Sequence, residues 1–278
     1  MTRLFACAAA VLLLAAPDPD ARQPVQYDVH AVRFATLPGF RVAALVAGAD
    51  RARTLDIAMM VWVLQGGGRV VLVDAGFHRE KFLRQWTPAD YRRPPDAVRA
   101  ALGLDPAAVT DIVLTHVHWD HADGVDLFPN SRVWIQRAEY EHHVGEQGGV
   151  ANRAIDPDVA AALFARRSAG RLELVDGDDR EILPGVRVYT GGRHTFASQF
   201  VGVATRGGPI VIASDNAYLY ENLEQRRAIA QTLDAASNLA AQARMVAIAG
   251  AIARVVPGHD PAVFDRFPLV KPGVARIQ

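Results

Sequence analysis

The segment THVHWDH, from Thr115 to His121, constrains this chain more than any other feature. It places three histidines and an aspartate within six residues, directly after the apolar run Ile112–Leu114. Such a run is typical of a buried strand, and functional side chains concentrate where strands end in loops. His116 and His118 are two residues apart, so in an extended backbone both imidazoles point to the same side and can share one metal ion.

A second ion is indicated by Asp120 and His121, which are consecutive and lie where the chain turns toward the next helix. The alternative is that all four are polar loop residues, or core histidines each satisfied by a backbone carbonyl. Burying so many polar groups without ions would leave donors and acceptors unmatched, which costs free energy. The cluster therefore predicts a metal centre.

The remaining ligands are expected at three other strand ends. His194 follows a strand in TGGRH, Asp215 in IASD and His259 in VVPGH. We expect a first site of His116, His118 and His194, a second of Asp120, His121 and His259, and Asp215 as the bridge between them. Nitrogen and oxygen ligands without sulfur favour two zinc ions, with iron, cobalt or manganese as alternatives.

The balance of charge argues against partners that bind through a strong electrostatic field. The chain has 278 residues, with 30 lysines and arginines against 30 aspartates and glutamates. No basic run would attract nucleic acid or an anionic membrane. Half of the residues are hydrophobic, as in an ordinary globular protein, and the length fits one α/β domain. We expect a small neutral substrate and neither nucleic acid nor a membrane as partner.

The first 22 residues are expected to be a secretory signal peptide and short leader, with residues 23–278 as the folded domain. Arg3 is the positive residue, Leu4–Ala16 is the apolar run, and small residues precede Pro17. The run is too short to span a bilayer, and the alternative is a first helix or strand of the core. The prediction is a periplasmic or secreted protein. Cys7, the only cysteine, lies in the signal, where a lipoprotein anchor is a weaker alternative.

Short β-rich runs separated by helical stretches predict an α/β fold. The clearest pair is Met59–Leu64 with Val70–Asp74, joined by a glycine turn, which is a hairpin signature. Further strands are expected at Ile112–Leu114, Val133–Gln136, Leu172–Val175, Val186–Thr190, Phe200–Thr205, Ile210–Ala213 and Val255–Val256, and helices at Asp96–Leu102, Asp158–Arg167, Tyr220–Leu233 and Ala236–Ala249. Strand pairs interleaved with helices, in two loosely similar halves, suggest two mixed sheets packed face to face with helices outside, although the periodicity alone fits other α/β folds.

The other histidines are not expected to bind metal. His30 and His78 are isolated, while His142 and His143 lie in a helical segment and are expected on a solvated face. The polar segment from His78 to Pro95 is either a lid or a connection. Five apolar residues are either the lining of a pocket for an acyl chain or ordinary core: Met59, Met60, Phe77, Trp119 and Phe196.

The chain resembles the metallo-β-lactamase superfamily, and within it the N-acyl-homoserine lactonases. THVHWDH is the hallmark, and other similar blocks are VLVDAGF, IQRAEYE, LPGVRVYT and PGHD. The resemblance implies an αββα sandwich of two mixed β-sheets with outer helices. In SDNAY it places Tyr218 where the lactonases have a tyrosine that polarises the substrate, and Asp74 resembles the aspartate that orients a ligand or the ligand loop.

The resemblance implies a dinuclear-metal hydrolase that opens the ester bond of lactones, most of all N-acyl-homoserine lactones, as in quorum quenching. Tyr218 would donate a hydrogen bond to the carbonyl, and Asp120 would pass the proton to the leaving group. TGGRH departs from the Pro-Gly-His turn of that branch, and the segment from His78 to Pro95 looks short and basic. The alternatives are a hydrolase for organophosphate triesters, thioesters or β-lactams, or an iron oxidoreductase on the same scaffold. A homodimer is an open alternative to a monomer.

Overall fold

The computed structural model describes residues 25–278. The predicted signal peptide and the predicted start of the domain at residue 23 therefore lie outside the described residues. Within residues 25–278, none of the helices combines the length and the apolar character that crossing a membrane requires.

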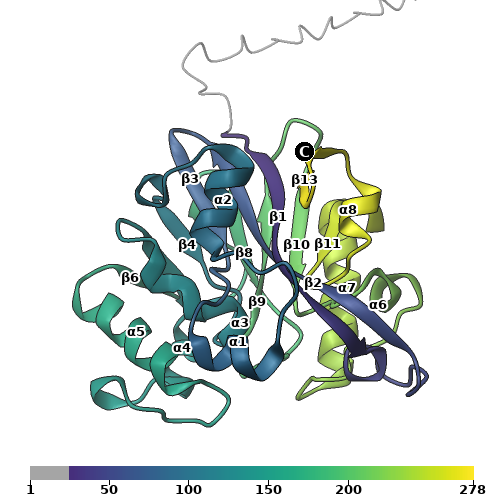
Figure 1. Cartoon of the computed structure of the whole chain (residues 1–278), viewed down its shortest axis with the longest axis horizontal. Coiled ribbons are helices and arrows are strands. Elements are labelled where there is room, and N and C mark those ends of the chain that lie inside the picture. Colours follow the sequence, from purple (N-terminus) through teal and green to yellow (C-terminus); the bar gives the residue numbers. More distant parts are fainter. Residues whose placement is uncertain (1–24) are drawn as a thin grey trace, which may run out of the picture.

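Two mixed β-sheets form the centre of the fold (Figure 1). The larger has the strand order β12-β13-β1-β2-β3-β4-β5-β6. Its strands are β1 (Asp28–Arg41), β2 (Thr54–Gly66), β3 (Arg69–Val73), β4 (Asp111–Val113), β5 (Arg132–Gln136), β6 (Leu172–Val175), β12 (Leu269–Lys271) and β13 (Val274–Arg276). Pairing is antiparallel from β12 to β3 and parallel from β3 to β6.

The smaller sheet has the order β11-β10-β9-β8-β7. Its strands are β7 (Arg180–Leu183), β8 (Val186–Thr190), β9 (Gln199–Val203), β10 (Ile210–Ser214) and β11 (Val255–Pro257). Only β10 and β11 run parallel, so their carboxyl ends lie side by side. This arrangement brings the residues that follow these two strands together.

Helices lie on both outer sides of the paired sheets (Figure 1). They are α1 (Glu80–Trp86), α2 (Pro94–Leu102), α3 (Trp119–Ala122), α4 (Arg137–His143), α5 (Pro157–Ser168), α6 (Tyr220–Glu224), α7 (Ala235–Ala249) and α8 (Val263–Arg266). Buried side chains of α1, α2 and α5 pack in one core with the larger sheet, while those of α6, α7 and α8 belong to a second core that includes the smaller sheet.

Strand β2 shows how the larger sheet separates the two cores. Met59, Val61 and Val63 face the core of α1, α2 and α5, while Met60, Trp62 and Leu64 face the smaller sheet. Successive side chains of a strand point to opposite faces, so a strand covered on both sides is apolar throughout. The αββα sandwich expected from the sequence is confirmed.

The helix expected over Tyr220–Leu233 is wrong beyond Glu224, where α6 ends. Arg226 has a φ of 51°, which a right-handed helix cannot contain. The side chain of Asn222 donates hydrogen bonds to the carbonyls of Arg227 and Ala228, and so replaces the helical bonding pattern with a turn. Helical composition alone does not reveal such a competing side chain.

Candidate metal centre

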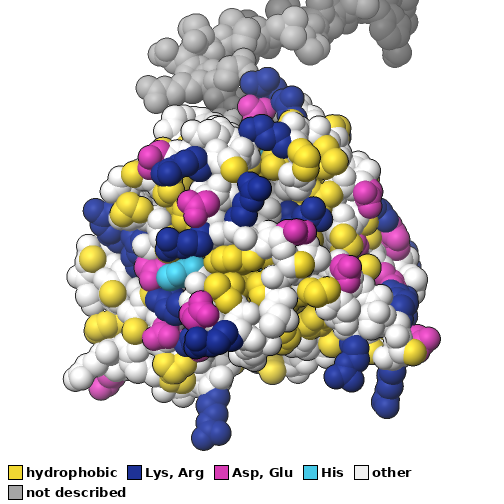
Figure 2. All heavy atoms as spheres, viewed as in Figure 1, with side chains coloured by type: hydrophobic (Ala, Val, Ile, Leu, Met, Phe, Trp, Pro, Cys, Tyr) yellow, Lys and Arg dark blue, Asp and Glu magenta, His cyan; other side chains and the backbone are white. Residues whose placement is uncertain are grey.

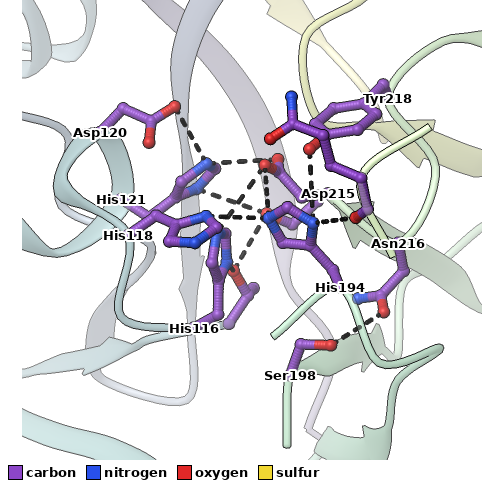
Figure 3. Close-up of polar contacts among 12 residues, drawn as sticks. His116, His118, Asp120, His121, His194, Ser198, Asp215, Asn216 and Tyr218 are labelled. Atoms are coloured by element: carbon purple, nitrogen blue, oxygen red, sulfur yellow. Dashed lines mark hydrogen bonds and ion pairs between the residues drawn. The ribbon is translucent and has the colours of Figure 1, made fainter. Parts of the chain in front are cut away.

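The seven predicted ligands lie in two adjoining groups, and Figure 3 labels all of them except His259. One group contains His116, His118, His194 and Asp215, and the other contains Asp120, His121 and His259. Within each group, one possible ligand atom from every residue lies within 4.8 Å of all the others. We call the seven residues the ligand cluster.

Asp215 lies between the two groups. Its Oδ2 is 3.3 Å from Nε2 of His194 and 3.7 Å from Nε2 of His116. Its Oδ1 is 3.2 Å from Nε2 of His121 and 3.1 Å from Nε2 of His259. One carboxylate oxygen therefore faces each group, which is the arrangement that a bridging ligand needs.

Each cluster residue stands at or just after the carboxyl end of a strand. His116 and His118 follow β4, and Asp120 and His121 lie in the short helix α3 that comes next. Asp215 and His259 follow the parallel neighbours β10 and β11. The loops that carry Asp215 and His259 are in close contact at Gly258, where an added Cβ would lie 2.7 Å from Oδ1 of Asp215. The glycine of PGHD is required because no side chain fits there.

Asp74 holds the loop that carries the first histidines. It follows β3 with a φ of 59°, an uncommon conformation for a residue with a side chain. Its Oδ1 accepts the backbone N–H of Thr115 at 2.8 Å, and its Oδ2 lies 2.8 Å from Nδ1 of His121 and accepts the hydroxyl of Ser214 at 3.0 Å. Asp74 therefore fixes the orientation of the His121 ring.

The imidazoles are turned so that one nitrogen of each faces the centre. Nδ1 of His194 lies 2.8 Å from the carbonyl of Gln231, and Nδ1 of His259 lies 3.1 Å from that of Ala58. These contacts leave Nε2 free to face the carboxylates. His118 is turned the other way, with Nδ1 2.9 Å from Nε2 of His194.

The buried polar atoms of the cluster fit divalent ions. Nε2 of His116, Nε2 of His121 and Oδ1 of Asp215 have no hydrogen-bond partner among the described residues. Leaving such atoms unmatched is costly unless a cation takes them as ligands. The chemistry of the set, imidazole nitrogen and carboxylate oxygen, suits such an ion.

The electrostatics of the cluster also favour the binding of divalent cations. Burial and neighbouring histidines lower the pKa of His118 to about 3 and hold the pKa of His116 well below its ordinary value, so both rings are neutral, as metal ligands must be. Although burial lowers the pKa of His121, the carboxylates of Asp215, Asp120 and Asp74 raise it well above its ordinary value. The carboxylates thus attract positive charge to this point, which a bound cation supplies.

Tyr218 lies against the first group. Its hydroxyl is 3.3 Å from Nδ1 of His194, and its ring centroid is 5.8 Å from that of His259. Burial, followed by the charges of Asp215 and Asp120, raises the pKa of Tyr218 well above its ordinary value, so the phenol keeps its proton. It can therefore act as a hydrogen-bond donor.

A cavity of about 240 Å³ opens onto the cluster at His118, Asp120, Asp215 and His259, and Tyr218 also lines it. Its apolar lining residues, which we call the apolar wall, are Leu37, Phe40, Leu45, Ile57, Met59, Trp86 and Trp119. The rings of Trp86 and Trp119 stack with centroids 5.5 Å apart, and Phe40 packs on Trp86 at 6.2 Å. The segment from His78 to Pro95 therefore contributes α1 and Trp86 to this wall.

Three of the residues weighed as pocket lining lie elsewhere, and one of them, Phe77, is fully buried in the core of α1, α2 and α5. Met60 faces the second core, and Phe196 is 39% exposed and stacks on His142. The expectation that His142 and His143 share a solvated face is wrong for His143, which is buried together with Glu139. His30 and His78 are not part of either ligand group.

Glu139 is a residue of the site region that sequence reasoning missed. Its side chain is fully buried and accepts the backbone N–H of Val117 at 3.3 Å and of Ala197 at 2.7 Å. It thus links the loop of His116 and His118 to the loop of His194. Its place in the IQRAEYE block was a usable signal, but the surrounding charged residues indicated an exposed helix.

A larger cavity, of about 400 Å³, lies beside β1, α2 and β13 and contains none of the cluster residues. Its charged lining residues are Arg33, Asp90, Arg92 and Lys271, all of them exposed. Pockets that bind substrates combine apolar walls with convergent buried polar groups. The smaller cavity has both, so it is the candidate site.

Comparisons with known proteins agree with this geometry. The family model described as the metallo-beta-lactamase superfamily matches residues 59–259. The chain is 28% identical over 174 residues to the N-acyl homoserine lactonase AttM of Rhizobium johnstonii, a match that covers 60% of this chain and 64% of that protein. It is 29% identical over 171 residues to the N-acyl homoserine lactonase AiiB of Agrobacterium fabrum, covering 56% and 60%. The matches span less than two thirds of these relatives' length.

The fold is also similar to solved structures. An N-acyl homoserine lactone hydrolase with the product N-hexanoyl-L-homoserine at its catalytic metal centre superposes with a TM-score of 0.73 and 18% identity, covering 89% of this chain and 98% of that one. The hydrolase AbOPH of the beta lactamase superfamily superposes with a TM-score of 0.66 and 18% identity, covering 92% and 94%. At these identities the likeness concerns the fold.

Proposed function

Since the chain belongs to the metallo-beta-lactamase superfamily, we propose that it is a dinuclear-metal hydrolase that opens the ester bond of lactones, N-acyl-homoserine lactones foremost. The observation that carries the proposal is the ligand cluster, in which Asp215 presents one oxygen to each group of histidines. The curated relatives, which are N-acyl homoserine lactonases, support the substrate class.

We propose zinc as the metal, held by the seven residues of the ligand cluster, because their nitrogen and oxygen atoms include no sulfur. Bound divalent ions supply Lewis acidity and water that ionises near neutral pH. In this proposal the phenol of Tyr218 donates a hydrogen bond to the carbonyl oxygen of the substrate and keeps its proton. Asp120, which lies on the cavity beside His259, would take the proton that the attacking water loses and pass it to the oxygen that leaves the ring.

The cavity supports a neutral, partly apolar substrate. Its lining is polar at the ligand cluster and apolar at the wall, and the apolar part suits an acyl chain. Figure 2 shows positive and negative side chains interspersed over one face of the molecule, with hydrophobic side chains near its centre. Together with equal numbers of acidic and basic residues, this favours a small molecule over nucleic acid.

The test is to purify the chain, measure metal per chain by mass spectrometry, and follow hydrolysis of homoserine lactones with short and long acyl groups. A simple lactone, a thioester, a phosphotriester and a β-lactam are assayed in parallel. We expect two zinc ions and fastest turnover of acyl-homoserine lactones. Two ions without lactone opening would contradict the substrate, and a chain that binds no metal would contradict the whole proposal.

Export to the periplasm or medium is part of the proposal and rests on the N-terminal sequence alone. We expect the chain expressed with its natural N-terminus to be recovered in the periplasmic or secreted fraction, without its first residues. N-terminal sequencing of the mature protein gives the cleavage point, and an uncleaved chain in the cytoplasm would contradict export.

A further inference from the structure

Asn216 lies between Asp215 and the loop that carries His194. The proposed mechanism gives Asn216 no role. It directly follows Asp215, and its side chain is buried beneath the loop that carries His194 (Figure 3). A polar side chain at such a place needs partners for two donors and two acceptor lone pairs. Where those partners lie indicates what the residue does.

All four hydrogen bonds of the Asn216 side chain are made. Its Oδ1 accepts the backbone N–H of Gly192 at 2.7 Å and the hydroxyl of Ser198 at 3.2 Å. Its Nδ2 donates to the carbonyls of Gln199 at 3.2 Å and Ala213 at 3.1 Å. One side chain thus ties both ends of the His194 loop to the end of β10, which carries Asp215.

The His194 loop is shaped around this side chain. A Cβ added at Gly191 would lie 2.3 Å from Oδ1 of Asn216, and one added at Gly192 would lie 2.4 Å from Cα of Asn238. The two glycines of TGGRH are therefore required by close approach. A proline at position 192 would also remove the N–H that Asn216 accepts. This accounts for the departure from the Pro-Gly-His turn noted in the sequence.

The loop is also held in a strained conformation. Arg193, immediately before His194, has a φ of 56°, which is unfavourable for a residue with a Cβ and persists only where neighbouring contacts impose it. The contacts around it are the bond from the N–H of Gly192 to Asn216, and the bonds that the carbonyl of Arg193 accepts from the N–H of Leu233 at 2.9 Å and the hydroxyl of Thr232 at 3.1 Å. The bond to Asn216 is the contact on the N-terminal side of Arg193, and without it we expect the ring of His194 to be held less closely against Asp215.

We propose that Asn216 is a positioning residue that sets the distance between His194 and Asp215 and so makes the first group fit for a metal ion. This inference rests on the metal centre of the proposed function. It predicts an effect on metal affinity that exceeds the effect of losing an equally buried asparagine elsewhere.

The test compares three variants, N216A, N216D and N222A, in the full chain. Asn222 is the matched control, because it is also fully buried and its side chain makes three hydrogen bonds, none of them to the His194 loop. In N216D a carboxylate oxygen still accepts from Gly192 and Ser198, but the other oxygen faces two carbonyls, so the fold is weakened while the loop stays tied.

Zn²⁺ and Co²⁺ are titrated into each metal-free protein, and unfolding is measured by heat. We expect N216A to bind one of the two ions about 10- to 100-fold more weakly, with an altered Co²⁺ absorption spectrum. N216D and N222A are expected to lose thermal stability but to keep the metal affinity and spectrum of the wild type. Hydrogen exchange should show a loosened segment 190–194 in metal-free N216A alone.

Equal metal affinity in N216A and wild type would overturn the inference, as would equal weakening in N216A and N222A. If N216A does not fold, N216D decides the question, because metal loss in that variant would mean that affinity follows fold stability and not the tie to Gly192. A wild-type chain that binds no metal would contradict the proposed function instead.

Discussion

The ligand cluster and the apolar wall line the same cavity, yet different forces hold them in place. In the cluster, the side chains of His116, His121 and Asp215 are only 1%, 3% and 5% exposed. Buried hydrogen bonds from Thr115 and Asp74, at strand ends of the larger sheet, fix the rings of His116 and His121. The wall consists partly of half-exposed rings, Trp86 and Trp119, that are held by stacking on each other.

This difference separates two properties of the proposed enzyme. Hydrogen bonds between buried groups allow few alternative arrangements, so the cluster can hold reacting groups in one geometry. Stacked apolar rings at the edge of a cavity tolerate changes of size and position. We therefore expect changes in the cluster to abolish metal binding or turnover, and changes in the wall to alter substrate preference.

The largest effect is expected from D215N, which removes the charge that faces both groups. Metal content should fall and kcat/KM should drop at least about 1,000-fold, since the loss amounts to several kcal/mol of transition-state stabilisation. Metal analysis and steady-state kinetics check this. D123N is the control, because Asp123 is fully buried but pairs with Arg79 and belongs to neither ligand group, and it should keep both ions. Wild-type metal content in D215N would contradict the bridge.

A second change, Y218F, tests the cluster without touching a ligand. Removing the phenolic donor should lower kcat about 100-fold while metal content stays at the wild-type value. The matched control is Y220F, since the hydroxyl of Tyr220 is buried without a hydrogen-bond partner among residues 25–278. Unchanged kinetics in Y218F would exclude a role for Tyr218 in turnover.

D74N tests how a residue outside the ligand cluster orients one of its histidines, His121. An amide in place of the carboxylate can no longer accept from the His121 ring and Ser214 together, so metal affinity should fall about 10- to 100-fold. Competition with a chelator measures this affinity. Asp111 is buried at the opposite end of β4, where it pairs with Arg69 and Trp134, and D111N should therefore leave metal affinity unchanged. Equal metal loss in both variants would mean that fold stability, and not the orientation of His121, sets affinity.

The smallest effect is expected from W86A, which opens the apolar wall. KM for a long-chain acyl-homoserine lactone should rise about tenfold, because roughly 1–2 kcal/mol of apolar contact is lost. KM for a short-chain substrate, kcat and metal content should change little. W86F should restore most of the long-chain affinity. If W86A lowers kcat equally for both chain lengths, the apolar wall affects turnover as well as substrate preference, which would contradict the comparison.

Much of the fold could be read from local patterns. The strands at Leu172–Val175 and Val186–Thr190 have the expected bounds, and the paired runs around the glycine turn at positions 66–68 form β2 and β3. These predictions hold because apolar alternation and turn residues act over a few neighbours. The helix predicted beyond Glu224 was wrong because the side chain of Asn222 decides the turn through contacts that composition does not encode.

In the candidate site, too, some features could be predicted from local patterns and others depended on tertiary contacts. His116, His118, Asp120 and His121 could be selected from spacing alone, and the other three because each followed an apolar run. Burial could not be read in this way. His143 and Glu139 carry polar side chains in a charged helix, and only packing against the neighbouring loops shows that both are buried.

The sequence by itself determined the chemical identity of the site and the class of fold, because ligand spacing and strand alternation are local properties of the chain. The tertiary structure alone decided which oxygen of Asp215 faces which group, how Asp74 and Asn216 hold the loops, and which rings form the apolar wall. These depend on contacts between residues far apart in sequence, whose distances are set by the packing of two sheets and not by any short run of amino acids.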